Sequence, residues 1–175
     1  MKQLLTLGAV ALVSMLAGVG LYQIWFAPED AKPVAQNQVQ LHAIPLTLLE
    51  GQESVLADWQ SDILVVNFWA PWCAPCRREV PTLIELQQDY GERGLEVLGI
   101  AFDGVEQVAQ FADEYQINYS LFIAGNRVSM YNAALGNPSG ALPYTVVLDR
   151  DLNIRFKHNG EVTREQLEKA LEGLI

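Results

Sequence analysis

The chain has 175 residues, half of them hydrophobic and 18% charged, which suits one ordinary domain with a short additional segment and excludes a disordered chain. Its 21 acidic and 11 basic side chains leave a formal net charge of -10, which argues against nucleic acid or an anionic membrane surface as a binding partner. Two cysteines are too few for a scaffold held by disulfides. They are nevertheless only three positions apart, as Cys73 and Cys76, and the function must account for this pair.

An apolar segment without any charged side chain opens the chain, at residues 4–26. A helix of this length spans roughly 35 Å, enough to cross the hydrocarbon core of a bilayer. Because the segment closes with bulky residues rather than the small ones of a cleavage site, we expect residues 1–26 to be an uncleaved signal-anchor; the alternative is a buried core helix. Lys2 precedes the segment and Glu29 and Asp30 follow it, which favours an N-terminus inside the cytoplasm and a body outside it.

Residues 27–40 differ in composition from the segment before them. They contain Pro28, Pro33 and several Gln and Asn residues, with little apolar content. This composition is typical of a tether. We therefore expect the globular domain to comprise residues 41–175.

Strand and helix patterns alternate along this domain. Two short extended segments are expected within residues 41–56, on either side of Glu50 and Gly51. Residues 63–69 read ILVVNFW, which is typical of a strand buried on both faces. The remaining patterns predict strands at 95–102, 120–124, 144–149 and 153–158, and helices at 74–90, 105–115, 127–135 and 163–174. A strand-helix-strand order first and a hairpin with a terminal helix last imply an α/β fold, with a mixed sheet covered by helices.

The Cys pair lies where the strand at 63–69 ends and the helix at 74–90 begins. A thiol at a helix N-terminus faces unpaired backbone N–H groups and the positive end of the helix dipole, which stabilise the nucleophilic thiolate. The spacing allows a disulfide, and Pro75 at the start of the helix loses no needed hydrogen bond. We therefore predict Cys73 as the exposed attacking thiol and Cys76 as the buried thiol that resolves the mixed disulfide. Arg77 and Arg78 either add positive potential or form a solvated face.

Three other interpretations of the Cys pair are weaker. A zinc site needs about four ligands, but His42 and His158 are far away in the sequence and there is no second Cys pair. A copper site would require Met or His near the pair, and the three Met are at positions 1, 15 and 130. Two inert core cysteines would fit an apolar strand better than a turn rich in Trp and Pro. We therefore expect no metal site.

Residues 66–81 read VNFWAPWCAPCRREVP, and this stretch resembles the active site of the thioredoxin superfamily. It is most similar to the membrane-anchored TlpA/ResA-like (DsbE-like) branch of thiol-disulfide oxidoreductases. The resemblance implies a thioredoxin-like mixed sheet flanked by helices, with an N-terminal strand pair and a central insertion at about 105–137. It also implies a redox-active Cys73–Cys76 disulfide and no dissociable cofactor.

The resemblance extends to the loop Leu142-Pro143 before the strand at 144–149, which matches the loop that bears a cis-proline in this family. It implies that Trp72, Leu142 and Pro143 contact the substrate. Either peptide isomer of Pro143 is compatible with the sequence, because a trans-proline opening a strand is common.

Glu79 matches the acidic residue found three positions after the second cysteine in this branch. The role implied is to accept a proton from Cys76, and the alternative is an ordinary surface glutamate. Pro81 matches the proline that kinks the first helix, a structural role. Asn67 departs from thioredoxins proper, which carry a buried Asp there. An amide exchanges no proton, so this departure increases the weight on Glu79.

The resemblance implies an enzyme in the cytoplasmic membrane, with a single span and its C-terminal domain in the periplasm or extracytoplasmic space. Its expected activity is the reduction of disulfides in client proteins with Cys pairs, for example during cytochrome c or copper-oxidase maturation. Electrons would come from a membrane thiol-reducing partner. The alternatives are a disulfide-forming oxidase and a non-catalytic copper-delivery or assembly protein that uses the Cys pair as ligands.

Overall fold

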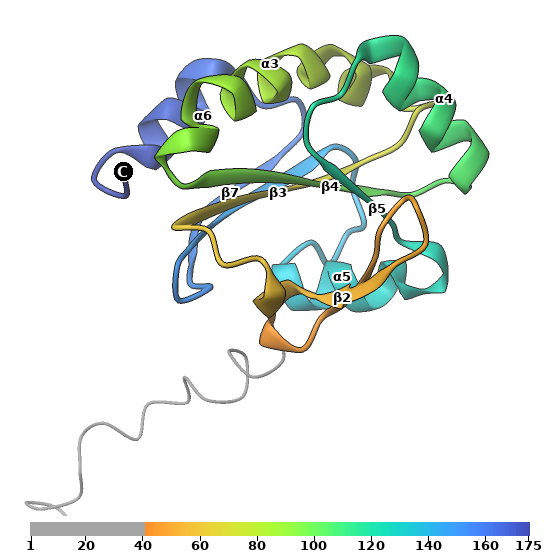
Figure 1. Cartoon of the computed structure of the whole chain (residues 1–175), viewed down its shortest axis with the longest axis horizontal. Helices are drawn as coiled ribbons and strands as arrows, with labels where there is room; N and C mark the ends of the chain where they lie inside the picture. The colour runs from red at the N-terminus through yellow and green to blue at the C-terminus, as the bar shows by residue number, and fades with distance from the viewer. Residues whose placement is uncertain (1–40) are drawn as a thin grey trace, which may run out of the picture. The chain divides into compact units, whose positions relative to one another are not determined.

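A mixed sheet of five strands is the centre of the fold (Figure 1). The structure is a computed structural model and describes residues 41–175. The strands follow the order β5-β4-β3-β6-β7; β3, β4 and β5 run parallel, and β6 is antiparallel to both β3 and β7. Their bounds are β3 Ile63–Trp69, β4 Leu95–Ala101, β5 Ser120–Ile123, β6 Tyr144–Asp149 and β7 Ile154–Asn159.

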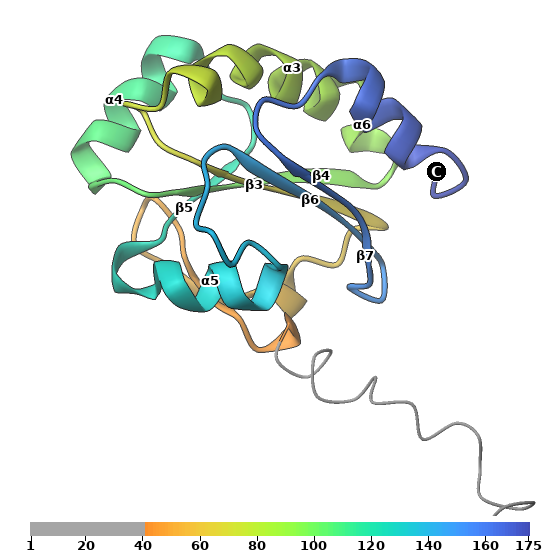
Figure 2. The same cartoon turned by 180° about the vertical axis from the view of Figure 1, so that it is seen from behind.

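Helices cover both faces of this sheet, as the front and back views show (Figures 1 and 2). One face carries α3, α4 and α6, and the other carries α5 together with an antiparallel pair of short strands, β1 and β2. The bounds are α3 Ala74–Tyr90, α4 Val105–Tyr115, α5 Val128–Leu135, α6 Arg164–Leu171, β1 Pro45–Thr47 and β2 Glu53–Val55. Short 3-10 turns at Leu56–Asp58, Gly91–Arg93 and Gly125–Arg127 connect them.

The central strand β3 divides the core into two clusters. Successive side chains of a strand point to opposite faces, and every residue of β3 is buried. Ile63, Val65 and Trp69 therefore pack in the cluster that contains α3 residues, whereas Leu64, Val66 and Phe68 pack in the cluster that contains α5 residues. Two covered faces explain why the strand reads as a nearly continuous apolar run.

Local sequence signals fix where α3 and α6 begin. Cys73 is the N-cap residue of α3, and Pro75 lies in the first turn. Thr163 caps α6 and forms a capping box with Gln166, as its spacing in the sequence suggests. The last helix ends at Leu171 rather than at 174, because the backbone leaves the helical region at Glu172 (ψ 121°).

The architecture confirms the expected α/β fold with a mixed sheet flanked by helices and an N-terminal strand pair. The region 105–137 contributes α4, β5 and α5. The anchor at 1–26 and the tether at 27–40 lie outside the described residues and stay predictions. Within residues 41–175, none of the helices is both long and apolar enough to cross a membrane.

Candidate active site

Cys73 and Cys76 form a disulfide across the first turn of α3. The Sγ atom of Cys73 accepts a hydrogen bond from the backbone N–H of Cys76 at 3.3 Å. Backbone N–H groups in the first turn have no partner inside the helix, so this donor is available to stabilise a Cys73 thiolate after reduction. Both cysteines are buried, so Cys73 is not the exposed thiol that we expected, although it keeps 6% of its surface exposed and Cys76 none. An incoming sulfur atom therefore reaches Cys73 first.

An exposed surface next to the cysteines comes from Trp72 and from the loop before β6. Trp72 is 68% exposed, more than any other large hydrophobic side chain of residues 41–175. Tyr144 pairs with Phe68, so the Leu142–Pro143 loop lies at the end of the sheet where β3 leads into the Cys pair. The peptide bond between Leu142 and Pro143 is cis, and Leu142 packs against the core cluster that contains both cysteines.

Two prolines shape the helix that carries the cysteines. Pro75 lies in its first turn, where a backbone N–H would have no helical acceptor. Pro81 lies inside α3, and its missing N–H removes one hydrogen bond of the helix. Both prolines act on the backbone and supply no reactive group.

Glu79 belongs to α3 and is buried, with only 1% of its surface exposed. It follows Cys76 by three positions, which places both side chains on the inward side of the helix. Its Oε1 accepts a hydrogen bond from Asn67 Nδ2 at 2.8 Å, and its Oε2 accepts one from the backbone N–H of Val162 at 3.0 Å. Burial outweighs these bonds and raises the pKa of the Glu79 carboxyl to about 7. Such a carboxyl exchanges protons near neutral pH, as a group that takes the Cys76 proton must.

Asn67, which lies in β3, positions the Glu79 carboxylate by a hydrogen bond. Its Nδ2 donates both to Glu79 and to Thr145 Oγ1, the latter at 3.0 Å. The neighbour of Asn67 on β4 is Gly99, where a Cβ would come within 3.0 Å of the Trp69 Nε1 atom. Glycine at position 99 thus allows the Trp69 side chain to approach the backbone of β4 closely.

Three buried side-chain atoms near this point have no hydrogen-bond partner among the described residues: Asn67 Oδ1, Trp69 Nε1 and the Tyr119 hydroxyl oxygen. Burial, followed by the charge of Glu79, raises the pKa of Tyr119, so its hydroxyl stays neutral. Buried polar atoms without partners are rare in folded proteins.

Both arginines that follow Cys76 bind groups other than the sulfur atoms. Arg77 donates a hydrogen bond to the Tyr115 hydroxyl at 2.9 Å and lies over the rings of Phe111 and Tyr115. Arg78 forms an ion pair with Glu161 at 2.6 Å. The partners of both guanidinium groups are therefore side chains other than the cysteines.

The segment after β7 contributes the Val162 N–H to the site and was not predicted from the sequence. A backbone donor carries no signature in its side chain, so no residue pattern identifies it. Thr145 follows the Leu142–Pro143 loop closely in the sequence, but its contact with Asn67 depends on the register of β3 against β6. Pairing these two strands correctly would have found it.

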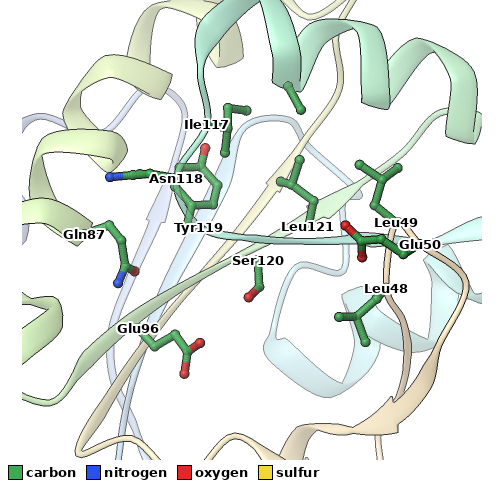
Figure 3. A pocket seen from close by; sticks show the side chains of 11 residues that line it. Leu48, Leu49, Glu50, Gln87, Glu96, Ile117, Asn118, Tyr119, Ser120 and Leu121 are labelled. Carbon is green, nitrogen blue, oxygen red and sulfur yellow. The ribbon is translucent and has the colours of Figure 1, made fainter.

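A cavity of about 380 Å³ lies at the β5 edge of the sheet (Figure 3). Figure 3 shows Tyr119 and Leu121 on one side of the backbone and Ser120 on the other. The loop after β1 closes part of this edge, because the Leu49 N–H donates to the Leu121 carbonyl at 2.9 Å. Neither cysteine lines this cavity, whereas Tyr119, on which the charge of Glu79 acts, is one of its lining residues.

The described residues contain no group of three or more His, Cys, Asp or Glu side chains placed to hold a metal ion. A disulfide and a dithiol differ by two electrons and two protons, so the Cys pair together with an acid is a complete redox centre. The geometry of residues 41–175 therefore favours thiol chemistry at this site.

Comparisons with known proteins agree with this chemistry. Residues 33–157 match the AhpC/TSA family. A thiol-disulfide oxidoreductase ResA of Bacillus cereus is 31% identical over 176 residues, which cover 98% of this chain and 96% of that protein. The thioredoxin-like protein YneN of Bacillus subtilis (strain 168) is 30% identical over 173 residues, 95% of this chain and 96% of its own. The crystal structure of a thioredoxin-related protein from Neisseria meningitidis serogroup B is 26% identical, with a TM-score of 0.67 over 74% of this chain and 97% of that one.

Proposed function

The chain belongs to the AhpC/TSA family and is a thiol-disulfide oxidoreductase similar to ResA, and from this premise we propose that it reduces the disulfides of client proteins outside the cytoplasm. The observation that carries this proposal is the buried Glu79 carboxyl, which lies three positions after Cys76 and has a pKa of about 7. The apolar segment at residues 4–26 supports a tether to the cytoplasmic membrane.

The reaction follows from the positions of the two cysteines and the acid. In the reduced protein, the Cys73 thiolate attacks one sulfur of a client disulfide, which forms a mixed disulfide and releases the first client thiolate. Cys76 then passes its proton to the Glu79 carboxylate and attacks the Cys73 sulfur. This step forms the Cys73–Cys76 disulfide and releases the second client thiolate. Two electrons pass from the protein to the client, and a membrane thiol-reducing partner restores the dithiol.

The direction of the reaction is argued from charge. A Cys pair becomes oxidising when its reduced, thiolate form is stabilised, for which nearby positive charge is the usual means. Here the nearby ionisable group is Glu79, whose negative charge above pH 7 opposes a second negative charge on sulfur. Arg78 is paired with the Glu161 carboxylate. We take the negative charge of Glu79 to outweigh the thiolate stabilisation that the Cys76 N–H offers Cys73, and on this ground we propose a reductant over a disulfide-forming oxidase.

The proposed client-binding surface combines Trp72, Leu142 and Pro143. Trp72 offers apolar contact area, and the loop of Leu142 and Pro143 lies at the same end of the sheet as the Cys pair. An extended client segment that lies along this loop would present its disulfide to Cys73, the more accessible sulfur.

An equilibrium titration of the Cys pair against glutathione tests the direction. We expect a potential below that of the glutathione pool, which is about -220 to -260 mV; a value near the roughly -120 mV of a strong oxidase would reverse the assignment. Reduction of insulin by the full-length chain, lost in Cys73→Ser, tests catalysis. Stoichiometric copper binding without turnover would instead support a delivery protein.

The clients and the location need experiments in cells. A Cys76→Ser variant keeps the attacking thiol and lacks the resolving one, so it traps clients as mixed disulfides. We expect trapped proteins with Cys pairs from cytochrome c or copper-oxidase maturation; recovery of abundant unrelated proteins alone would indicate a broad reductase. Protease digestion of the C-terminal domain from the outer side of intact membranes tests the location.

A further inference from the structure

Residues 160–162 form a short connector between β7 and the cap of α6, and each residue contacts a different part of the active site. The Gly160 N–H donates to the Pro143 carbonyl at 2.9 Å. The Glu161 carboxylate pairs with Arg78, two positions after Cys76, at 2.6 Å. The Val162 N–H donates to Glu79 Oε2 at 3.0 Å. One segment therefore touches the client-binding loop, the helix of the Cys pair and the acid.

The connector is held firmly at both ends. Gly160 has a φ of +100°, a conformation that favours glycine because a side chain would be strained there. Val162 is 1% exposed and packs in the same core cluster as both cysteines. Thr163 then caps α6. With its ends fixed, the connector holds the Gly160 and Val162 N–H groups at set positions.

The Arg78–Glu161 pair is too exposed to be explained by stability. Its side chains are 60% and 38% exposed, and ion pairs at that exposure contribute little to folding. The pair does, however, hold a negative charge next to a buried carboxyl. The conformation of the connector is also fixed around it, since His158 Nε2 lies 3.2 Å from the Glu161 carbonyl oxygen.

The groups that face Glu79 come from every element packed around it. Asn67 of β3 and the Val162 N–H of the connector donate to it and lower its pKa, and the Glu161 carboxylate raises it. Thr145 of β6 accepts a hydrogen bond from the Asn67 amide that also donates to Glu79. Tyr119, which precedes β5, stays neutral beside it, and the Cys76 sulfur lies one turn earlier on α3. Among these groups, Glu161 alone carries a charge that a surface partner, Arg78, can balance.

We propose that the 160–162 connector couples the client-binding loop to the proton acceptor, with Glu161 and Arg78 as positioning residues for Glu79. The proposal rests on the proposed role of Glu79 in the reaction. A client that binds to the Pro143 loop then affects the protonation of Glu79 through one rigid segment. Glu161 and Arg78 act through Glu79 and touch neither client nor sulfur.

The charge part of the proposal is tested by titrating Glu79 in the oxidised full-length chain, through the infrared carboxyl band that Glu79→Gln removes. Glu161→Gln removes a like charge, so the midpoint falls by about 0.5 pH unit; Arg78→Met leaves Glu161 unbalanced, so the midpoint rises by a similar amount. Glu53→Gln, which breaks the remote pair with Arg127, is the matched control and leaves the midpoint unchanged. Shifts in one direction for both variants, or none, would overturn the proposal.

The coupling part is tested at Gly160. A Cβ there meets no atom within 4 Å, so Gly160→Ala strains the backbone without a clash and loosens both N–H contacts. We expect a higher Glu79 midpoint and, from the loosened client loop, a KM for insulin raised roughly 3- to 10-fold. Gly51→Ala is the matched control, because Gly51 has a φ of +92° and equally open surroundings. If Gly160→Ala destabilises the chain as Gly51→Ala does but changes neither quantity, the connector couples nothing.

These measurements separate the inference from the proposed function. If the Glu79 midpoint moves as expected and the pH dependence of mixed-disulfide resolution moves with it, both stand. If the midpoint moves but the pH dependence of resolution does not, the positioning by Glu161 and Arg78 holds and the role of Glu79 as proton acceptor fails. If resolution follows the wild-type Glu79 titration but the variants leave that titration unchanged, the role of Glu79 stands and the inference fails.

Discussion

The buried polar side chains on the two faces of the sheet differ in their chemistry and in their hydrogen-bond partners. On the α5 face, the hydroxyl of Tyr131 donates to the Pro45 carbonyl, and that of Tyr144 donates to the carbonyls of Leu135 and Gly136. On the α3 face, Asn67 donates to Glu79 and to Thr145, and the Glu79 carboxyl can lose a proton; on the α5 face the buried side chains of Asn137 and Asn132 also bind each other, but amides do not titrate. The α5 face thus ties its hydroxyls to the backbone, whereas the α3 face keeps a group that can change its protonation state.

This difference separates polar groups that hold the fold from those that serve the reaction. A hydroxyl donating to a backbone carbonyl has one stable arrangement, and its loss costs stability. A buried carboxyl with a pKa of about 7 is costly to ionise, and the proton transfer proposed above would account for its place three positions after Cys76. One strand serves both faces, because Phe68 and Asn67 are neighbours that point in opposite directions.

The largest expected effect is on the α5 face, at Phe68. This side chain is fully buried and contacts the rings of Phe102 and Tyr144. We expect Phe68→Ala to lower the free energy of unfolding by about 4 kcal/mol, as measured by denaturant titration, and to leave the potential of the Cys pair unchanged. A shifted potential would show that the two faces are not independent.

The next largest effect is a pH dependence of the free energy of unfolding, caused by Glu79 on the α3 face. The pKa of Glu79 is about 7 in the folded chain, against an ordinary value of 4.5. Between these values the folded chain binds a proton that the unfolded chain has lost, so stability falls as pH rises and then levels off above pH 7. The full decrease is about 3 kcal/mol. Unfolding at several pH values checks it, and Glu79→Gln, which cannot titrate, should lack this slope.

Catalysis gives a somewhat smaller effect at the same residue. Without a proton acceptor beside Cys76, we expect Glu79→Gln to slow the resolution of the mixed disulfide about 100-fold at pH 7. Its formation should be nearly unchanged, because Cys73 attacks without needing this group. Rapid-mixing experiments with a Cys-containing peptide disulfide separate the two steps. Equal slowing of both steps would argue for a general disturbance of the site instead.

Local patterns in the sequence predict most of the fold. The apolar run at 63–69 and the helical periodicities at 74–90 and 105–115 coincide with β3, α3 and α4, because the apolar patterns that specify these elements lie within them. The placement of Glu79 on the Cys helix follows from spacing in the same way. Its pKa does not, because that depends on Val162, which is 83 positions away in the sequence, and on how completely the packed helices exclude water.

The smallest effects come from Tyr144 and Thr145, neighbours in β6 that face opposite sides. Each loses hydrogen bonds to the rest of the protein in Tyr144→Phe and Thr145→Val, so each should lower the free energy of unfolding by about 1 kcal/mol. Thr145→Val also frees the Asn67 amide to turn away from Glu79, which weakens the bond to the carboxylate and raises the pKa of Glu79. The pH profile of resolution should therefore move upward in Thr145→Val and stay in place in Tyr144→Phe. Because the two variants are matched in position and cost, a shift in both would mean that protonation at the site responds to loss of stability alone, and the distinction between the faces would fail.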